Sequence, residues 1–202
     1  MANKTYERSY FEELDRVDPL KGFYSKFDLP EGVIYLDGNS LGALPKGVAE
    51  RVSEVVQNEW GKSLIKSWNV HDWYPQPSRV GDKIAKLIGA EKGTVVSADS
   101  TSVNLFKLLT AAVRLNEKLN PGRRVILSDT GNFPNDLYVI QGLVDLLGDE
   151  YEMRLVAPEE IEEALTEDVA AAVITQVDYR TGRRHAMADL QSCANAIGIK
   201  VI

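Results

Sequence analysis

The sequence predicts an α/β fold with a mostly parallel sheet flanked by helices. Short apolar runs alternate with amphipathic helical patterns through the second half of the chain, and parallel strands need helical crossovers of this kind. The run at 171–177 is almost entirely apolar, as expected for a strand covered on both faces. A chain of 202 residues can bury a substantial core as one domain or a large piece of one.

Composition narrows the class of protein. The chain is 44% hydrophobic and 26% charged, as in ordinary soluble globular proteins. Its net charge of −7 argues against a nucleic-acid partner, and no apolar run approaches a membrane span. Cys193 is the only cysteine, and His71 and His185 are far apart, which argues against a disulfide or a metal site. We expect a cytoplasmic protein.

In the first half of the chain, proline, glycine and apolar spacing define the expected elements. Pro45 suits the first turn of a helix and Gly89 the end of one. Residues 61–77 are irregular and aromatic, and such rings plug a core edge, line a pocket or contact a partner subunit. The predicted elements are helices at 6–16 and 19–27, a strand at 33–36, a turn-rich loop at 37–42, a helix from Pro45 with Val48, Val52, Val55, Val56 and Trp60 on one face, and a helix carrying Val80, Ile84, Leu87 and Ile88.

The stretch 95–104 predicts a strand, a tight polar loop and the start of a helix over 102–115. Its Asp, Ser and Thr side chains can accept hydrogen bonds from the unpaired N–H groups of the first helical turn. The same N–H groups, with the hydroxyls and the helix dipole, suit a phosphate. Taken by itself, the stretch is best interpreted as a helix-capping segment. The phosphate-binding interpretation requires evidence from other parts of the sequence.

The remaining elements alternate regularly. The pattern predicts strands at 124–127, 151–156, 171–177 and 199–202, and helices from Pro134 to Gly148, from Pro158 to Leu165 and over 187–197. The sequence stops inside the last strand. Ligands bind at the carboxyl ends of parallel strands, so the loop after Ile202 would ordinarily carry functional groups. We therefore expect a fragment of a longer protein.

Five loops carry a recognisable combination of residues, in order along the chain. They are Leu36-Asp37-Gly38-Asn39-Ser40-Leu41-Gly42, Glu59-Trp60-Gly61-Lys62 with Trp68, Thr101-Ser102-Val103-Asn104-Leu105, Phe133-Pro134-Asn135-Asp136 and Tyr179-Arg180-Thr181-Gly182. In order and spacing these loops resemble the kynureninase family of fold-type I enzymes, which use pyridoxal 5′-phosphate (PLP). The resemblance runs from about residue 8 to the end.

The resemblance implies a cofactor site. Thr101 and Ser102 match the loop that holds the cofactor phosphate, and Phe133 matches the aromatic residue that stacks on the pyridine ring. The residues matching cofactor-binding positions are Thr101, Ser102, Phe133, Pro134, Asn135, Asp136 and Thr175. Plain structural interpretations stay open: a core aromatic for Phe133, a first-turn charge for Asp136 and a core hydroxyl for Thr175.

It also implies substrate contacts at Ser40 and Trp68, although a β-turn role for Ser40 and a packing role for Trp68 are alternatives. Arg180 and Arg183 receive no assignment. No catalytic residue is expected within the chain, because the family's Schiff-base lysine would lie beyond Ile202. On this basis we expect the chain to be inactive by itself.

The implied architecture is the fold-type I, aminotransferase-like large domain, incomplete. Residues 1–60 would form an N-terminal helical segment with the substrate loop, and 61–202 the first part of the PLP-binding domain. The implied enzyme is a homodimer that hydrolyses L-kynurenine or 3-hydroxykynurenine to anthranilate or 3-hydroxyanthranilate and L-alanine, in tryptophan catabolism and NAD biosynthesis. The alternatives are a non-catalytic binding or dimerisation module and another fold-type I lyase, such as one resembling cysteine desulfurase.

Overall fold

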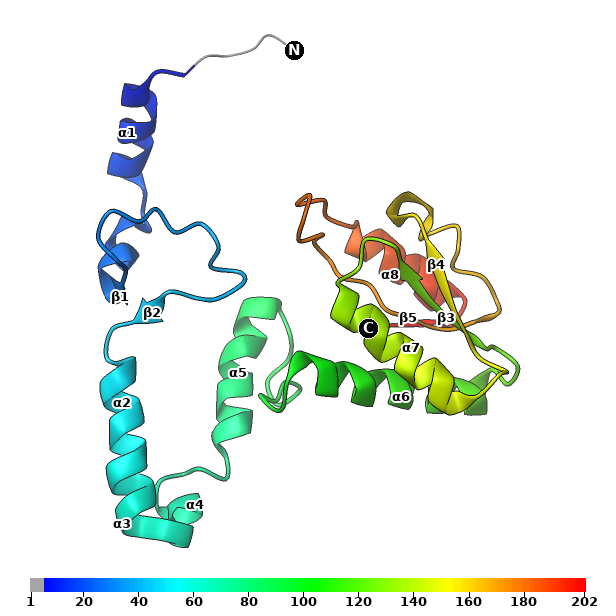
Figure 1. Ribbon diagram of the computed structural model, residues 1–202, viewed down its shortest axis with the longest axis horizontal. Helices are drawn as coiled ribbons and strands as arrows, with labels where there is room; N and C mark the ends of the chain where they lie inside the picture. The colour runs from blue at the N-terminus through cyan, green and yellow to red at the C-terminus, as the bar shows by residue number, and fades with distance from the viewer. Residues whose placement is uncertain (1–5) are drawn as a thin grey trace. The chain divides into compact units, whose positions relative to one another are not determined.

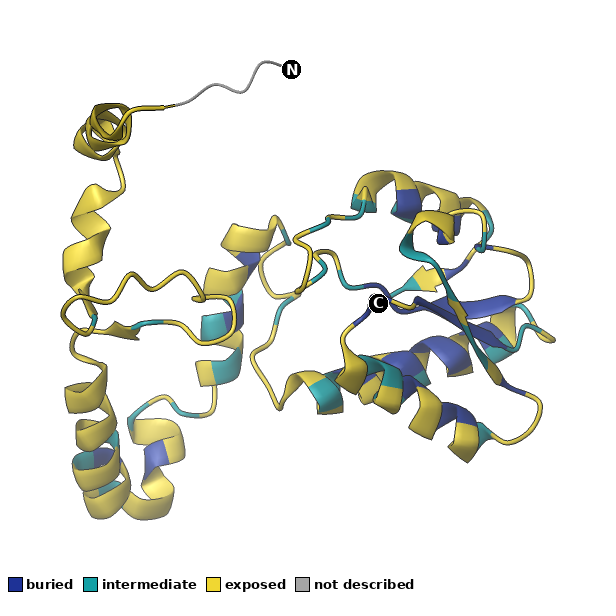
Figure 2. Ribbon diagram, turned by 45° about the horizontal axis from the view of Figure 1, so that its top comes forward, coloured by how far each residue is buried: buried dark blue, intermediate teal, exposed yellow. Residues whose placement is uncertain are grey.

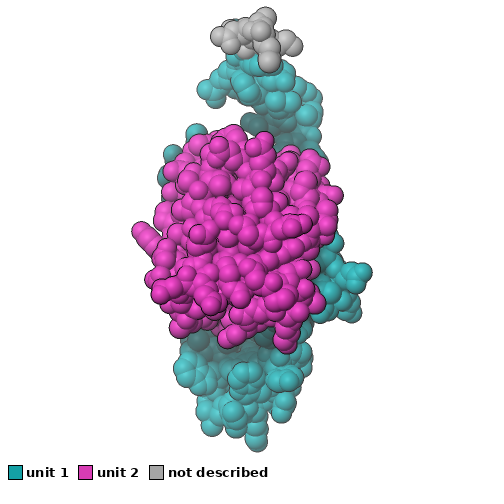
Figure 3. Space-filling view, turned by 90° about the vertical axis from the view of Figure 1, so that its right-hand side faces the viewer, with its two compact units in different colours: residues 1–96 teal, residues 97–202 magenta. Residues whose placement is uncertain are grey.

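The computed structural model describes residues 6–202. Its contacts divide the chain into two compact units, one ending at Val96 and the other running from Ser97 to Ile202 (Figure 3). The domain boundary expected at residue 60 remains a prediction. The two units reflect only the contacts within this chain and do not test where a domain begins.

The first unit is built from short helical pieces and one small antiparallel pair of strands (Figure 1). The longest helix is α5, which ends at Gly89 in the left-handed conformation, as its sequence predicts. The elements are α1 (Arg8–Val17), the 3₁₀ helix η1 (Lys21–Lys26), β1 (Phe27–Asp28), β2 (Leu44–Pro45), α2 (Val48–Glu54), the π-helical η2 (Val55–Trp60), α3 (Gly61–Ser63), the 3₁₀ helix η3 (Leu64–Lys66), α4 (Ser67–Val70) and α5 (Gln76–Ile88).

Three sequence-based expectations for residues 33–77 are wrong. Residues 33–36 form no strand. Instead, Phe27–Asp28 pairs with Leu44–Pro45, so the segment at 33–36 lies in the connection and lacks a partner strand. The helix expected from Pro45 begins at Val48, because Pro45 belongs to β2. Residues 61–77 are largely helical rather than irregular.

The first unit buries little of its own surface. Within 6–96, only Glu59, Ser67, Gly81 and Ala85 are buried (Figure 2). At Gly81, α5 lies directly against the backbone of residues 95 and 96, since an added Cβ would stand 2.0 Å from the Val95 carbonyl oxygen. This close approach requires glycine. The strand expected at Val95 and Val96 is absent, and no strand in the described residues pairs with it.

The second unit is a parallel α/β sheet, as predicted. The strand order is β4-β3-β5-β6, and every pair is parallel. The elements are α6 (Thr101–Leu119), β3 (Val125–Asp129), α7 (Pro134–Leu147), β4 (Glu152–Val156), the 3₁₀ helix η4 (Pro158–Glu160), β5 (Val169–Ala172), α8 (Met187–Ala196) and β6 (Lys200–Val201).

Two core clusters cover the two faces of this sheet. Side chains of a strand alternate between faces, so Ile126 and Ala171 pack with α6 and α7, whereas Leu127 and Ala172 pack with α8. Figure 2 shows the buried residues concentrated in these three layers. The arrangement fixes the carboxyl ends of β3 and β5 beside each other.

Among the described residues, every helix is too short or too polar to span a membrane.

Boundaries in the second unit shift from those expected. Helix α6 runs from Thr101 to Leu119, longer at both ends than 102–115. The segment 158–165 forms only one 3₁₀ turn, because its four glutamates repel one another along a short helix. Strand β5 begins at Val169, and the extended chain after it still bonds through Val173 N–H to the Leu127 carbonyl at 2.9 Å.

Candidate functional site

Two helices of the second unit begin close to each other. Ser100 caps α6, because its side chain accepts a hydrogen bond from the Val103 N–H. Helix α7 begins at Pro134, a residue suited to a first helical turn. The Asn135 amide of α7 donates to the Ser102 hydroxyl of α6 at 2.8 Å. The positive ends of two helix dipoles therefore meet at one place, which favours an anion.

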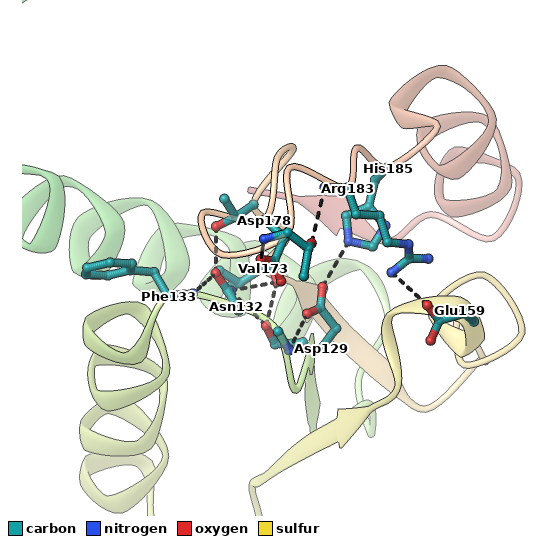
Figure 4. A network of polar contacts seen from close by, with 12 residues as sticks. Asp129, Asn132, Phe133, Glu159, Val173, Asp178, Arg183 and His185 are labelled. Atoms are coloured by element: carbon teal, nitrogen blue, oxygen red, sulfur yellow. Dashed lines mark hydrogen bonds and ion pairs between the residues drawn. The ribbon is translucent and has the colours of Figure 1, made fainter. Parts of the chain in front are cut away.

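The loop between β3 and α7 is held by buried polar side chains (Figure 4). Asn132 is 5% exposed, and its carbonyl oxygen accepts from the Phe133 N–H at 2.7 Å and from the Thr175 hydroxyl at 2.6 Å. On the other side, its amide donates to the Ser128 hydroxyl at 2.9 Å. Thr175 is thus linked to the loop that carries Phe133.

Asp129, at the end of β3, holds a second loop at the carboxyl edge of the sheet. Its carboxylate accepts from the Gly131 N–H at 2.7 Å and lies 3.1 Å from Nε2 of His185. The side chains of Asp129 and His185 are 5% and 9% exposed. This contact ties the chain after the turn at residues 179–182 to the carboxyl edge of the sheet.

Phe133 presents an aromatic ring beside the two helix starts. The residue is 47% exposed, and its ring meets the edge of Tyr179 with centroids 5.0 Å apart. A core aromatic would be buried, so the plain structural interpretation of Phe133 is disfavoured. An exposed ring of this kind can stack against a planar ligand.

Asp136 lies in the first turn of α7 and is partly buried. Burial raises the pKa of its carboxyl above the usual value, while the side chains of Thr175 and Asn135 act in the opposite direction. A carboxyl perturbed by desolvation next to polar groups is typical of functional sites. The structure therefore brings the predicted site residues Asn135, Asp136 and Thr175 together, and the bond from Asn135 to Ser102 joins them to the start of α6.

This set fits a cofactor with a phosphate and an aromatic ring. The phosphate would meet the start of α6 with the Thr101 and Ser102 hydroxyls, and the ring would meet the exposed face of Phe133. Asp136 and Thr175 add polar groups next to that ring. The donors and the aromatic surface therefore match what pyridoxal phosphate requires of a protein.

The predicted substrate residues lie in the first unit. Trp68 lines a pocket of about 420 Å³ together with Arg51, Val55, Glu59, Trp73, Gln76 and Pro77. Ser40 lies in an exposed turn, where its hydroxyl donates to Asp37 at 2.8 Å. The β-turn interpretation of Ser40 is thus consistent with the structure, and its substrate contact stays a prediction, as does that of Trp68.

Sequence reasoning assigned no role to two buried polar residues. Asn132 precedes the Phe133 motif without a feature of its own, and only the fold brings Thr175 to it. Glu59 lies in a quoted motif, yet its burial is not visible in the sequence. Its carboxylate contacts Arg51 and Trp73, each at 2.6 Å, and these two partners lower its pKa.

Solved structures place the fold. A NifS-like protein matches 83% of this chain and 48% of its own length, with a TM-score of 0.63 and 15% identity. DndA from Streptomyces lividans matches 78% of this chain and 45% of its own length, with a TM-score of 0.58 and 17% identity. The parallel sheet with its flanking helices is therefore part of the fold of the fold-type I PLP-dependent enzymes.

Sequence comparison is more specific. The chain is 48% identical over 186 residues to a kynureninase of Burkholderia pseudomallei (strain 1106a), covering 92% of this chain and 45% of that protein. It is 47% identical over 190 residues to a kynureninase of Pseudomonas fluorescens, covering 94% and 46%. The resemblance to kynureninase is confirmed, and the chain spans about 45% of the length of these relatives. No family model matches.

Proposed function

We propose that this chain is part of a PLP-dependent hydrolase that cleaves L-kynurenine, or its 3-hydroxy form, to anthranilate, or 3-hydroxyanthranilate, and L-alanine. One observation supports it above all. The starts of α6 and α7 are joined by the Asn135–Ser102 hydrogen bond, with the exposed ring of Phe133 beside them, in a chain 48% identical to kynureninases.

The residues of this chain would bind and orient the cofactor. Thr101 and Ser102 would hold the phosphate, Phe133 would lie against the ring, and Asp136 and Thr175 would offer polar groups to it. When bound, pyridoxal phosphate supplies an electron sink for the negative charge that develops on the substrate's α-carbon. Ser40 and Trp68 would contact the substrate. Water is the second substrate, and its oxygen ends in the carboxylate of the anthranilate product.

The lysine that anchors the cofactor would lie outside this chain, as the sequence resemblance implies. The 202-residue chain is therefore expected to be inactive alone, while the intact protein is active as a cytoplasmic homodimer in tryptophan catabolism and NAD biosynthesis. Many large apolar side chains of residues 6–96 are exposed, and large apolar patches usually mark an interface. The remainder of the protein and the second subunit of the proposed homodimer would cover them.

The test is the release of anthranilate, followed by its fluorescence, from L-kynurenine by the intact protein. We expect turnover that requires added PLP after cofactor removal, and none from the 202-residue chain. Sulfide release from L-cysteine, measured in parallel, distinguishes another fold-type I lyase. An intact protein that releases no anthranilate from L-kynurenine, no 3-hydroxyanthranilate from 3-hydroxykynurenine and no sulfide from L-cysteine would refute the enzyme proposal and favour a binding or dimerisation module.

A further inference from the structure

We propose that Asn132 is a positioning residue that sets the place of Phe133 and Thr175 at the cofactor site. The inference rests on the proposed function, because the ring and the hydroxyl that it positions are those assigned to pyridoxal phosphate. Asn132 itself faces the sheet and acts through its neighbours. Figure 4 shows it between Asp129, Phe133 and Val173.

All hydrogen-bonding groups of the Asn132 side chain are used. Its Nδ2 donates to the Ser128 hydroxyl at 2.9 Å and, at a longer 3.4 Å, to the Val173 carbonyl. Its Oδ1 accepts from the Phe133 N–H at 2.7 Å and from the Thr175 hydroxyl at 2.6 Å. A rotation of the amide would break both sets at once, so this environment fixes its orientation.

The partners of Nδ2 are rigid. Ser128 belongs to β3 and is fully buried, and its hydroxyl donates to the Val173 carbonyl at 2.7 Å. Val173 follows β5 directly and is 3% exposed. The Asn132 amide is therefore anchored on the ends of two paired strands, and Oδ1 is held at one point relative to the sheet.

The partners of Oδ1 have less support from packing. Phe133 is 47% exposed, and its ring contacts only the edge of Tyr179 among the described aromatic residues. Thr175 lies beyond the last residue of β5 and is only partly buried, although the Ile174 N–H before it still donates to the Ile202 carbonyl at 3.0 Å. Because packing does not enclose the side chains of Phe133 and Thr175, we infer that the bonds to Oδ1 fix where the ring and the hydroxyl stand.

The experiment compares variants of the intact protein after removal of the cofactor. Apoprotein is titrated with PLP, and visible absorption and visible circular dichroism report affinity and the orientation of the bound ring. Asn132→Ala is expected to weaken PLP binding about tenfold and to change the dichroism. Asn116→Ala is the matched control, since Asn116 is also 5% exposed and hydrogen-bonded, near the opposite end of α6. It should lower the melting temperature but keep PLP affinity within twofold.

Asn132→Asp separates positioning from general stability. A carboxylate keeps the acceptor for Phe133 and Thr175 but loses the donor to Ser128 and Val173. The Ser128 hydroxyl can turn to donate to the carboxylate, at the cost of its bond to the Val173 carbonyl. We expect a lower melting temperature with PLP affinity within threefold and an unchanged dichroism. This variant remains informative if Asn132→Ala does not fold, since a loss of tenfold or more in folded Asn132→Asp overturns the inference.

The outcomes also separate this inference from the proposed function. Intact wild-type protein that binds no PLP refutes both. Wild-type protein that binds PLP, with Asn132→Ala indistinguishable from Asn116→Ala in affinity and dichroism, refutes the positioning role alone.

Discussion

Replacing Asn135 with alanine tests whether the contact between α6 and α7 matters for the cofactor. The substitution removes the 2.8 Å hydrogen bond from Asn135 to the Ser102 hydroxyl. Both residues precede the buried parts of their helices, so the fold should remain. With the bond gone, Ser102 is free to take other rotamers, and the hydroxyl proposed to contact the phosphate is no longer oriented.

The magnitude follows from the nature of the bond. An exposed side-chain hydrogen bond contributes about 0.5–1.5 kcal/mol net, and about 1.4 kcal/mol corresponds to tenfold in affinity. Asn135→Ala in the intact protein should therefore weaken PLP binding by roughly two- to twelvefold, with a melting temperature close to that of the wild type. The assay is titration of the apoprotein, followed by visible absorption.

Asn195→Ala provides a matched control. The Asn195 side chain on α8 accepts a hydrogen bond from Gln191 at 2.8 Å, and both bonds join exposed side chains. This helix packs on the other face of the sheet from α6 and α7, so PLP affinity should not change. Equal affinities for Asn135→Ala and wild type would refute the idea that this hydrogen bond orients the phosphate contact.

Three further predictions concern stability. Gly81→Ala should lower the free energy of unfolding by about 3 kcal/mol or more, because its Cβ would stand 2.0 Å from the Val95 carbonyl oxygen. The control is Gly142→Ala in α7, which has open space around it and should stabilise the protein by about 0.5–1 kcal/mol. Equal melting temperatures of the two variants would contradict the clash at Gly81. His185→Ala should cost about 2 kcal/mol, because Asp129 would lose a buried partner, and denaturant unfolding measures it. Burial raises the pKa of Asp136, so its ionisation destabilises the fold as pH rises through that pKa. Asp136→Asn should therefore raise the melting temperature at pH 7, with a gain that shrinks toward pH 4. A gain in melting temperature that is independent of pH would contradict the raised pKa.

The sequence alone determined the parallel sheet and the long helices. Proline and glycine marked α7 from Pro134 to its end before Gly148, and Gly89 ended α5, because these residues act through their own backbone geometry. That residues 101–102 and 133–136 share one site was implied only by the family resemblance. The helix ends depend on residues near in sequence, which is why the sequence alone could predict them.

Tertiary structure decided what depends on distant partners. Val33–Leu36 and Val95–Val96 are apolar and β-branched in part, yet neither is a strand, because a strand exists only where another strand accepts its hydrogen bonds. Asn132 likewise accepts a hydrogen bond from Thr175, 43 positions later. Only the pairing of β3 with β5 brings these two residues together. The sequence resemblance predicted residues that would contact a cofactor, whereas only the fold showed that Asn132 is hydrogen-bonded to two of them, Phe133 and Thr175.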